Sequence, residues 1–334
     1  VFLCNDTIMK KNTHLEHPED TIFSGKEDFM EMLRFLRCEE NTISVKYDGA
    51  PAIVWGIDPQ TKRFFVGTKS VFNKVKIKIN YTHADIEKNH GDKPRVASIL
   101  HSCMDCLPRI EGIFQGDFIG WGGERVYTPN CITYKFFDTI APETIVFAAH
   151  THYVGNTIKD AEVRFGFPYD VSPPEVYANR QKGKPFGQDK VRFVNTNVTI
   201  TSRHRRINHF IRLAGVVANL VTFPGRKEGE RLKIQVNRCI REQKDISDAG
   251  MSKMQTYLYK LIMHIKELLM ENMEADELCK CYFEEEECDH EGAVMSNRYG
   301  TFKLVDRREF SYRNFTTAKK WLNEGAKVTF PMDT

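Results

Sequence analysis

Four side chains in separate β-type runs have the types that nucleotidyl transfer needs. The first is Lys46, in the run Lys46-Tyr47-Asp48-Gly49, and the others are Asp117, Glu291 and Lys303. A lysine amine that attacks the α-phosphate of a nucleoside triphosphate must be unprotonated, and nearby cations or a metal ion disfavour its charged form. Carboxylates can hold Mg²⁺ or Mn²⁺, and a second lysine can stabilise the phosphate charge of the transition state. Together these types predict phosphoramidate chemistry at Lys46.

Each run taken singly has a plainer explanation. A surface lysine followed by an Asp-Gly turn between two strands would account for Lys46 to Gly49 without any chemistry. The order of the runs along the chain favours the chemical interpretation, because Gly116–Gly120, Glu291–Val294 and Phe302–Val305 follow one another downstream.

This order resembles the motif order of the covalent nucleotidyltransferase superfamily, which comprises ATP-dependent DNA ligases, RNA ligases and mRNA capping enzymes. The run from Lys46 to Gly49 resembles motif I, K-x-D-G. The resemblance implies that Lys46 takes up AMP from ATP as a covalent lysyl-AMP. It also implies that the nucleotide is contacted by Val45, Asp48 and Gly49.

Three further motifs of the superfamily have counterparts between motif I and the middle of the chain. Thr68-Lys69-Ser70 stands in the place of motif Ia, which implies that Lys69 contacts the ribose or the phosphates. Gly116–Gly120 is similar to motif III, with Asp117 where the family has Glu, and implies a ribose or metal role for this shorter carboxylate. Thr144–Phe147 stands where motif IIIa is expected, which implies that Phe147 stacks on adenine.

The last two motifs lie far downstream. Glu291–Val294 resembles motif IV, which implies that Glu291 is a metal-site carboxylate. Phe302–Val305 resembles motif V and implies that Lys303 contacts the phosphates, although many members have two lysines there. The resemblance covers residues 43–150 and 288–306. The segment from Lys46 to Ala52 also resembles proteins of large bacteriophages that carry K-[FY]-D-G-A-P-A, and we therefore expect a viral protein.

The periodicity of apolar residues predicts a mixed α+β fold interrupted by a helical insertion. The resemblance to the superfamily implies that this fold is an antiparallel-sheet nucleotidyltransferase core of the ATP-grasp-like ligase kind. Residues 1–165 and 287–334 would form the two parts of this core, and residues 166–286 a mostly helical insertion. Helices are predicted over 26–37, 96–107, about 204–282 and 316–323. Strands are predicted over 113–121, 132–137, 144–149, 292–295 and 301–305, with short β runs between 42 and 72. Only 31 residues follow Lys303, too few for the OB domain of DNA ligases and capping enzymes.

Composition leaves the partner open. The net charge of the chain is only +3, so a nucleic-acid partner depends on two local clusters: Lys69, Lys74, Lys76 and Lys78, and Arg203-His204-Arg205-Arg206. Solvated faces would explain both clusters equally well. No apolar run approaches the roughly 20 residues that span a bilayer, and the N-terminus lacks a signal-peptide pattern. We expect a monomer without membrane contact in the cytoplasm, that of the host if the protein is viral.

The cysteines and several polar groups have ordinary explanations. Nine cysteines with irregular spacing predict reduced thiols rather than disulfides. Zinc is the less favoured alternative for Cys103-x2-Cys106 and for Cys279, Cys281, Cys288 and His290, because the second group lacks the paired two-residue spacing of zinc ribbons.

Three other features also have plain interpretations. Glu16–Asp20 reads as a turn before a helix. His150 and His152 read as an alternating strand pair. The helical insertion reads as a scaffold with its own small core.

The sequence thus predicts an ATP-dependent polynucleotide ligase, with RNA favoured as the strand. It would join 5′-phosphate and 3′-hydroxyl ends of RNA or a nicked duplex, with Mg²⁺ or Mn²⁺ as cofactor. A DNA ligase with an atypical clamp is the alternative within this class. A nucleotidyltransferase fold that binds nucleic acid without catalysis, and an enzyme that adenylylates itself or other proteins, are the alternatives outside it.

Overall fold

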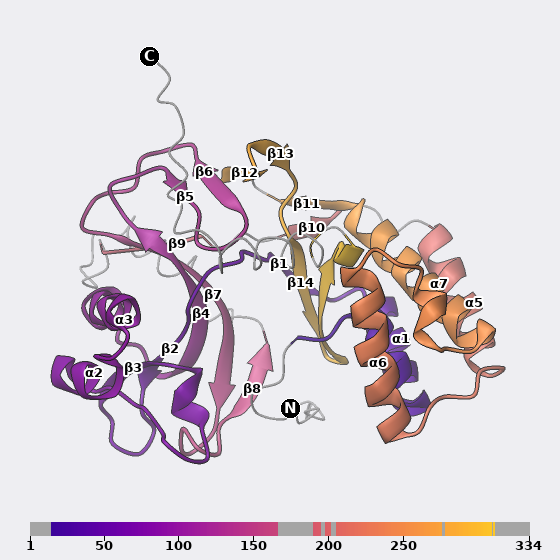
Figure 1. Ribbon diagram of the computed structural model, residues 1–334, viewed down its shortest axis with the longest axis horizontal. Coiled ribbons are helices and arrows are strands. Elements are labelled where there is room, and N and C mark those ends of the chain that lie inside the picture. Colours follow the sequence, from indigo (N-terminus) through magenta and orange to yellow (C-terminus); the bar gives the residue numbers. More distant parts are fainter. Residues whose placement is uncertain are drawn as a thin grey trace.

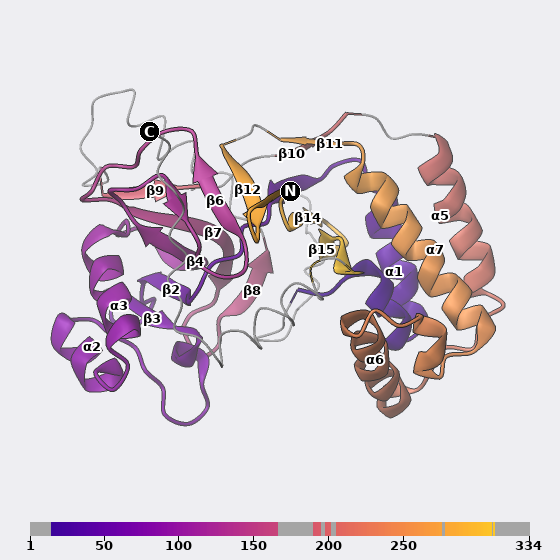
Figure 2. The same cartoon turned by 45° about the horizontal axis from the view of Figure 1, so that its top comes forward.

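The computed structural model describes residues 15–165, 190–194, 198–201, 205–275, 278–308 and 310. The fold is mixed α+β with several antiparallel sheets, which confirms the predicted fold class at this level. Figures 1 and 2 show a large sheet with helices beside it at one end of the molecule and a group of helices at the other. A smaller sheet, which has three strands, lies between them (Figure 1).

The three-stranded sheet joins the two ends of the described chain. Its order is β1 (Thr42–Val45), β14 (Gly292–Asn297) and β15 (Gly300–Val305), and all pairs are antiparallel. Val45 lies opposite Ala293 in the β1–β14 pair, and Val294 lies opposite Lys303 in the β14–β15 pair. The residues just after β1, just before β14 and within β15 are therefore neighbours in space.

The largest sheet contains most of the strands between the first motif and residue 193. Its order is β3 (Phe64–Thr68), β2 (Ala52–Ile57), β4 (Gly112–Trp121), β7 (Ile145–Val154) and β8 (Glu162–Phe165), with β9 (Val191–Phe193) parallel to β7. Side chains from this sheet and from α3 (Pro94–Cys106) form one apolar cluster, which α2 (His83–His90) joins through Ile86. The two helices thus cover one face of the sheet.

Two smaller sheets follow from pairings between distant segments. One has the order β13 (Glu286–Cys288), β12 (Cys279–Phe283), β6 (Thr133–Phe136) and β5 (Val126–Tyr127). The other pairs β10 (Val198–Ile200) with β11 (Met273–Ala275). Strands therefore return at residue 273, within the range that the sequence predicts to be mostly helical.

Four α-helices gather on the three-stranded sheet. They are α1 (Lys26–Arg37), α5 (Arg205–Ala218), α6 (Arg226–Arg241) and α7 (Lys253–Met270), with the 3₁₀ helices η1 (Pro18–Phe23) and η4 (Ile246–Ala249) between them. Helix α7 begins with a capping box, in which Ser252 and Gln255 bond each other's backbone N–H groups. Apolar side chains of these helices and of β1, β14 and β15 form a single cluster. The expectation of a separate small core is wrong, because the helices bury their apolar faces against the sheet.

The other predicted elements agree with the structure to within a few residues. The predicted helix over 26–37 and the predicted strands over 113–121, 292–295 and 301–305 are confirmed. Helix α2 and the strands β12 and β13 were not predicted. The predicted helix over 316–323 lies outside the described residues. Among the described helices, none combines the length and apolarity that crossing a bilayer requires.

Buried charges join the first turn of the described chain to the helices. Glu19 in η1 accepts a hydrogen bond from Lys266 Nζ of α7 at 2.7 Å, and both side chains are almost fully buried. Asp20 accepts one from Arg307 Nη1 at 2.6 Å, and Arg307 also donates to Tyr259 Oη at 2.6 Å. Glu16–Asp20 does lie ahead of a helix, as predicted. The helix dipole is not the main partner of Glu19 and Asp20, because both are buried and hold η1 against α7 and the end of β15.

Removing Lys266 should destabilise the protein strongly. The substitution Lys266→Met leaves the Glu19 carboxylate buried, with Arg307 Nη1 at 3.8 Å and His17 Nδ1 at 3.9 Å, and should lower the free energy of unfolding by about 3 kcal/mol. The matched control is Lys260→Met on the same helix, because Lys260 pairs with Asp245 at 3.2 Å where both side chains are about half exposed. That change should cost less than about 1 kcal/mol. Equal losses in urea denaturation would contradict the role assigned to the buried pair.

Candidate active site

The connection between β1 and β2 carries the predicted nucleophile from one sheet to another. Lys46 follows β1, and its N–H donates to Gly292 O at 2.8 Å. Four residues on, Ala50 N–H donates to Phe118 O of β4 at 3.0 Å. Gly49 allows this close passage, since a Cβ there would lie 2.7 Å from Phe118 O and 2.9 Å from the Asp117 Cβ. The glycine of the K-x-D-G pattern is therefore required by packing.

Lys46 and Glu291 form an ion pair at the meeting point of β1 and β14. Burial alone would lower the pKa of Lys46, but the carboxylates of Glu291, Asp48 and Asp117 outweigh it and raise this pKa. The sequence-based expectation was the reverse, with cations disfavouring the charged lysine. In this arrangement the carboxylates keep Lys46 in its ammonium form.

Lys303 is the second cation of the site. It lies opposite Val294 in the β14–β15 pair, and its backbone N–H donates to Glu16 O at 3.0 Å. Burial and then the charge of Lys46 lower the pKa of Lys303, and Glu291 opposes the shift. The structure thus brings together Lys46, Glu291 and Lys303, as the motif order predicts.

Asp48 has partners that sequence reasoning missed. Its backbone N–H donates to Tyr134 Oη at 2.8 Å, and Asn130 Nδ2 donates to Asp48 Oδ2 at 2.6 Å. Burial, followed by the charge of Glu291, raises the pKa of Asp48 to about 6. More than 80 residues separate Asp48 from either partner, and no local pattern marks Asn130 or Tyr134 as site residues.

Asp117 and Lys69 belong to the large sheet. Asp117 in β4 lies opposite Ala52 on one side and Ala148 on the other, and its Oδ1 is 3.7 Å from His150 Nε2. Lys69 follows Thr68, which lies opposite Ile53 of β2. Since neighbouring strands are about 4.8 Å apart, the backbone at Lys69 lies about 10 Å from Asp117, at the same end of the sheet. His150 and His152 both lie in strand β7, as predicted, and His150 also lies beside the candidate site residue Asp117.

Two predicted nucleotide contacts belong to the hydrophobic core. Phe147 is 0% exposed and packs between Trp55 and Phe193, with its ring centroid 5.2 Å from that of Trp55. It lies in the cluster that faces α3, so its ring is not available to stack on adenine, and this expectation is corrected. The Val45 side chain is also buried, in the cluster beneath the three-stranded sheet, so only its backbone could meet a nucleotide.

The residues around Lys46 fit a divalent cation by type. The carboxylates of Asp48, Asp117 and Glu291 all act on the charge of Lys46. Carboxylate oxygens are the ligands that Mg²⁺ and Mn²⁺ prefer. The predicted basic cluster over Arg203–Arg206 is described only in part, because Arg203 and His204 lie outside the described residues. Arg205 and Arg206 are exposed at the start of α5.

The chain belongs to the DUF6267 family, which is described as a family of unknown function, and residues 12–257 and 248–319 match it. This match spans both parts of the candidate site and the helices between them. No curated protein and no solved structure matches the chain.

The raised pKa of Asp48 predicts how its replacement changes stability with pH. Its folded pKa of about 6 exceeds the value of about 3.9 in an unfolded chain, so ionisation of Asp48 opposes folding. Its contribution to stability is complete below about pH 4 and is lost as the pH rises through 6. Asp48→Asn should therefore stabilise the protein by about 3 kcal/mol at pH 7.5 and by almost nothing at pH 4.

Urea denaturation of both proteins across this pH range measures the difference. The exposed substitution Asp92→Asn serves as the control and should change stability little at either pH. A stabilisation by Asp48→Asn that is independent of pH would contradict the assigned cause.

Proposed function

We propose that the protein is an ATP-dependent polynucleotide ligase, with RNA favoured as the strand, and that Lys46 carries AMP during the reaction. The observation that carries the proposal is the contact between Lys46 and Glu291, which are 245 positions apart in the sequence. Lys303 lies close enough to Lys46 that the charge of Lys46 helps burial to lower the pKa of Lys303. A surface lysine in an ordinary turn would not be largely covered and paired with a residue of a distant motif.

The charge balance around Lys46 suggests how the nucleophile is activated. Glu291 is the strongest influence that keeps Lys46 protonated, while burial works in the opposite direction. If Glu291, Asp48 and Asp117 held a divalent cation, burial and the charge of Lys303 would remain to disfavour the ammonium. Mg²⁺ or Mn²⁺ would supply charge neutralisation at the phosphates of ATP. Glu291 would thus keep Lys46 protonated in the free protein, and Lys46 would lose its proton more readily once a cation held this carboxylate.

The proposed reaction has three steps. The neutral Lys46 amine forms a bond from Nζ to the α-phosphorus of ATP, the bond to pyrophosphate breaks, and the amine loses its remaining ionisable proton to water. A 5′-phosphate oxygen of the strand then forms a bond to the phosphorus of AMP, the bond to Lys46 Nζ breaks, and the amine takes up a proton. Finally, a 3′-hydroxyl oxygen bonds the 5′-phosphorus and loses its proton to water, AMP leaves, and the phosphodiester bond is complete. Lys303 stabilises the negative charge on the α-phosphate in these steps.

A nucleic-acid partner is supported by the basic segment that follows Lys69. Lys74 and Lys76 are exposed in the loop after η2 (Lys69–Phe72), which begins at the site end of the large sheet. Phosphate contacts from such lysines add affinity without sequence preference and weaken as salt rises. This loop is therefore a candidate binding surface for the phosphates of the nucleic-acid strand.

Covalent labelling tests the first step. Incubation with α-labelled ATP and Mg²⁺ should label the protein through an acid-labile, alkali-stable bond, and Lys46→Ala should abolish the label. Lys303→Met should slow labelling about 100-fold, because one cation at the transition state is lost. Lys88→Ala, an exposed lysine of α2, should label as the wild type does. No label with any nucleoside triphosphate would rule out the enzyme and favour binding without catalysis.

Sealing assays test the strand and the role of the basic loop. Nicked RNA and single-stranded RNA with 5′-phosphate ends should be sealed faster than nicked DNA. Lys74→Ala/Lys76→Ala should reduce sealing about tenfold at physiological salt while leaving the lysyl-AMP label intact. The control Lys227→Ala/Lys253→Ala removes two exposed lysines from the first turns of α6 and α7. Faster sealing of DNA would identify a DNA ligase, and label without any sealing would point to protein-directed adenylylation.

A further inference from the structure

Three cysteines and a histidine share one face of the hairpin formed by β12 and β13. Cys279 and Cys281 are two residues apart in β12, and Cys281 lies directly opposite Cys288 of β13. Residues two apart in a strand, and residues opposite each other in a pair, point to the same side of a sheet. The irregular spacing in sequence therefore becomes a regular cluster, because two chain segments are paired.

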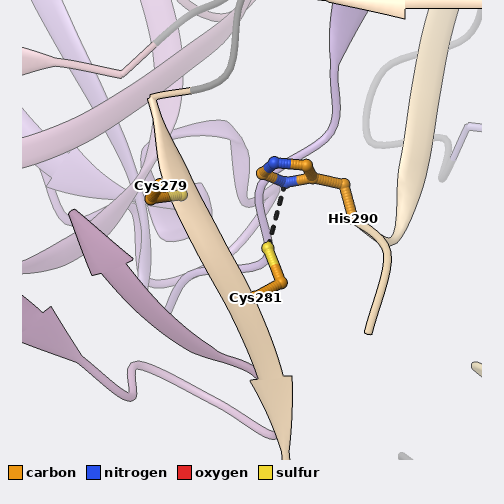
Figure 3. Close-up of side chains that lie close together, drawn as sticks. All are labelled: Cys279, Cys281 and His290. Carbon is orange, nitrogen blue, oxygen red and sulfur yellow. Dashed lines mark hydrogen bonds between the residues drawn. The ribbon is translucent and has the colours of Figure 1, made fainter. Parts of the chain in front are cut away.

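The possible ligand atoms of Cys279, Cys281 and His290 lie close together. Figure 3 shows the Cys279 and Cys281 side chains on one strand and the His290 ring facing Cys281. Cys281 Sγ and His290 Nδ1 are 3.3 Å apart, and the ligand atoms of all three residues lie within 4.8 Å of one another. Both cysteines are buried and His290 is partly exposed.

These atoms suit zinc in type and spacing. Zinc binds thiolate sulfur at about 2.3 Å and imidazole nitrogen at about 2.0–2.1 Å in a tetrahedron, so its ligand atoms are roughly 3.3–3.8 Å apart. The observed group needs only a small contraction to reach this geometry. Mg²⁺ and Mn²⁺ prefer oxygen ligands, so this group is chemically distinct from the carboxylates around Lys46.

We propose that Cys279, Cys281 and His290 bind one structural Zn²⁺, and that Cys288 supplies the fourth ligand by rotating its side chain. Binding releases the thiol protons and forms zinc–thiolate bonds without any change of redox state. Four protein ligands make a closed site, which stabilises the fold and has no open position for catalysis.

The zinc site would support the candidate active site through His290. His290 directly precedes Glu291, and its ring centroid lies 5.3 Å from that of Tyr47 and 6.4 Å from that of Tyr134. Tyr47 follows Lys46, and Tyr134 accepts the backbone N–H of Asp48. Fixing His290 therefore fixes the backbone from which Glu291 reaches Lys46. Zinc binding itself does not depend on the proposed ligase activity.

Metal analysis of the purified full-length protein tests the proposal. Protein prepared under reducing conditions, stripped and then reloaded with zinc should hold about one ion per chain. Titration with Co²⁺ should give a thiolate-to-cobalt charge-transfer band and the strong visible bands of tetrahedral coordination. Cys279→Ser/Cys281→Ser should weaken zinc affinity at least about 100-fold and lower the melting temperature. His290→Ala should weaken binding and alter the cobalt spectrum while keeping the charge-transfer band.

The matched control is Cys103→Ser/Cys106→Ser, which removes two thiols that are buried in α3 outside the cluster. This variant should bind zinc as the wild type does. Absence of both zinc and the cobalt band in the wild-type protein would overturn the proposal. So would retention of zinc in the Cys279/Cys281 variant, or a Cys281–Cys288 disulfide found by intact mass under native reducing conditions. Lys46→Ala should lose the AMP label but keep zinc, so failure of the ligase proposal and failure of this one are distinguishable.

Discussion

The contact between Lys46 and Glu291 is the constraint on which the candidate site depends. Both residues are withdrawn from water, and an ion pair in such a place is favourable only when its surroundings hold both partners in position. The pairing of β1 with β14 provides this support, since Lys46 N–H bonds the carbonyl of the residue after Glu291. Neither part of the core could form the site alone.

A second set of buried charges continues from this site into the helices. Arg307 lies just beyond β15 and bonds Asp20 and Tyr259, while Glu19 bonds Lys266 of α7. Arg307 also contributes to the lowered pKa of Lys303. The helices between the two halves of the core therefore hold β15, and with it Lys303, through ionic contacts as well as through a shared apolar cluster.

The sequence predicted which residues meet at the candidate site better than it predicted the side chains that surround them. Motif order identified Lys46, Glu291 and Lys303, and alternation of apolar residues located β4, β14 and β15, because both signals are local. An apolar run does not say which layer its side chains enter, so Phe147 was assigned to the nucleotide although it packs on Trp55. Asn130 and Tyr134 reach Asp48 through loop and strand placement that no local pattern encodes. The cysteine cluster was undervalued for the same reason, since it depends on the register of β12 and β13.

The crossing of the β1–β2 connection from one sheet to the other has a geometric consequence. Lys46, Glu291 and Lys303 belong to the three-stranded sheet, whereas Asp117 and Lys69 belong to the large one. A small rotation between the sheets would therefore leave the first three groups in fixed relation and change only their distances to the other two. Gly49 is pressed against β4 and lies three residues after Lys46. The connection that joins the two sheets therefore also carries Lys46, so the spacing between the sheets sets the distance from Lys46 to Asp117.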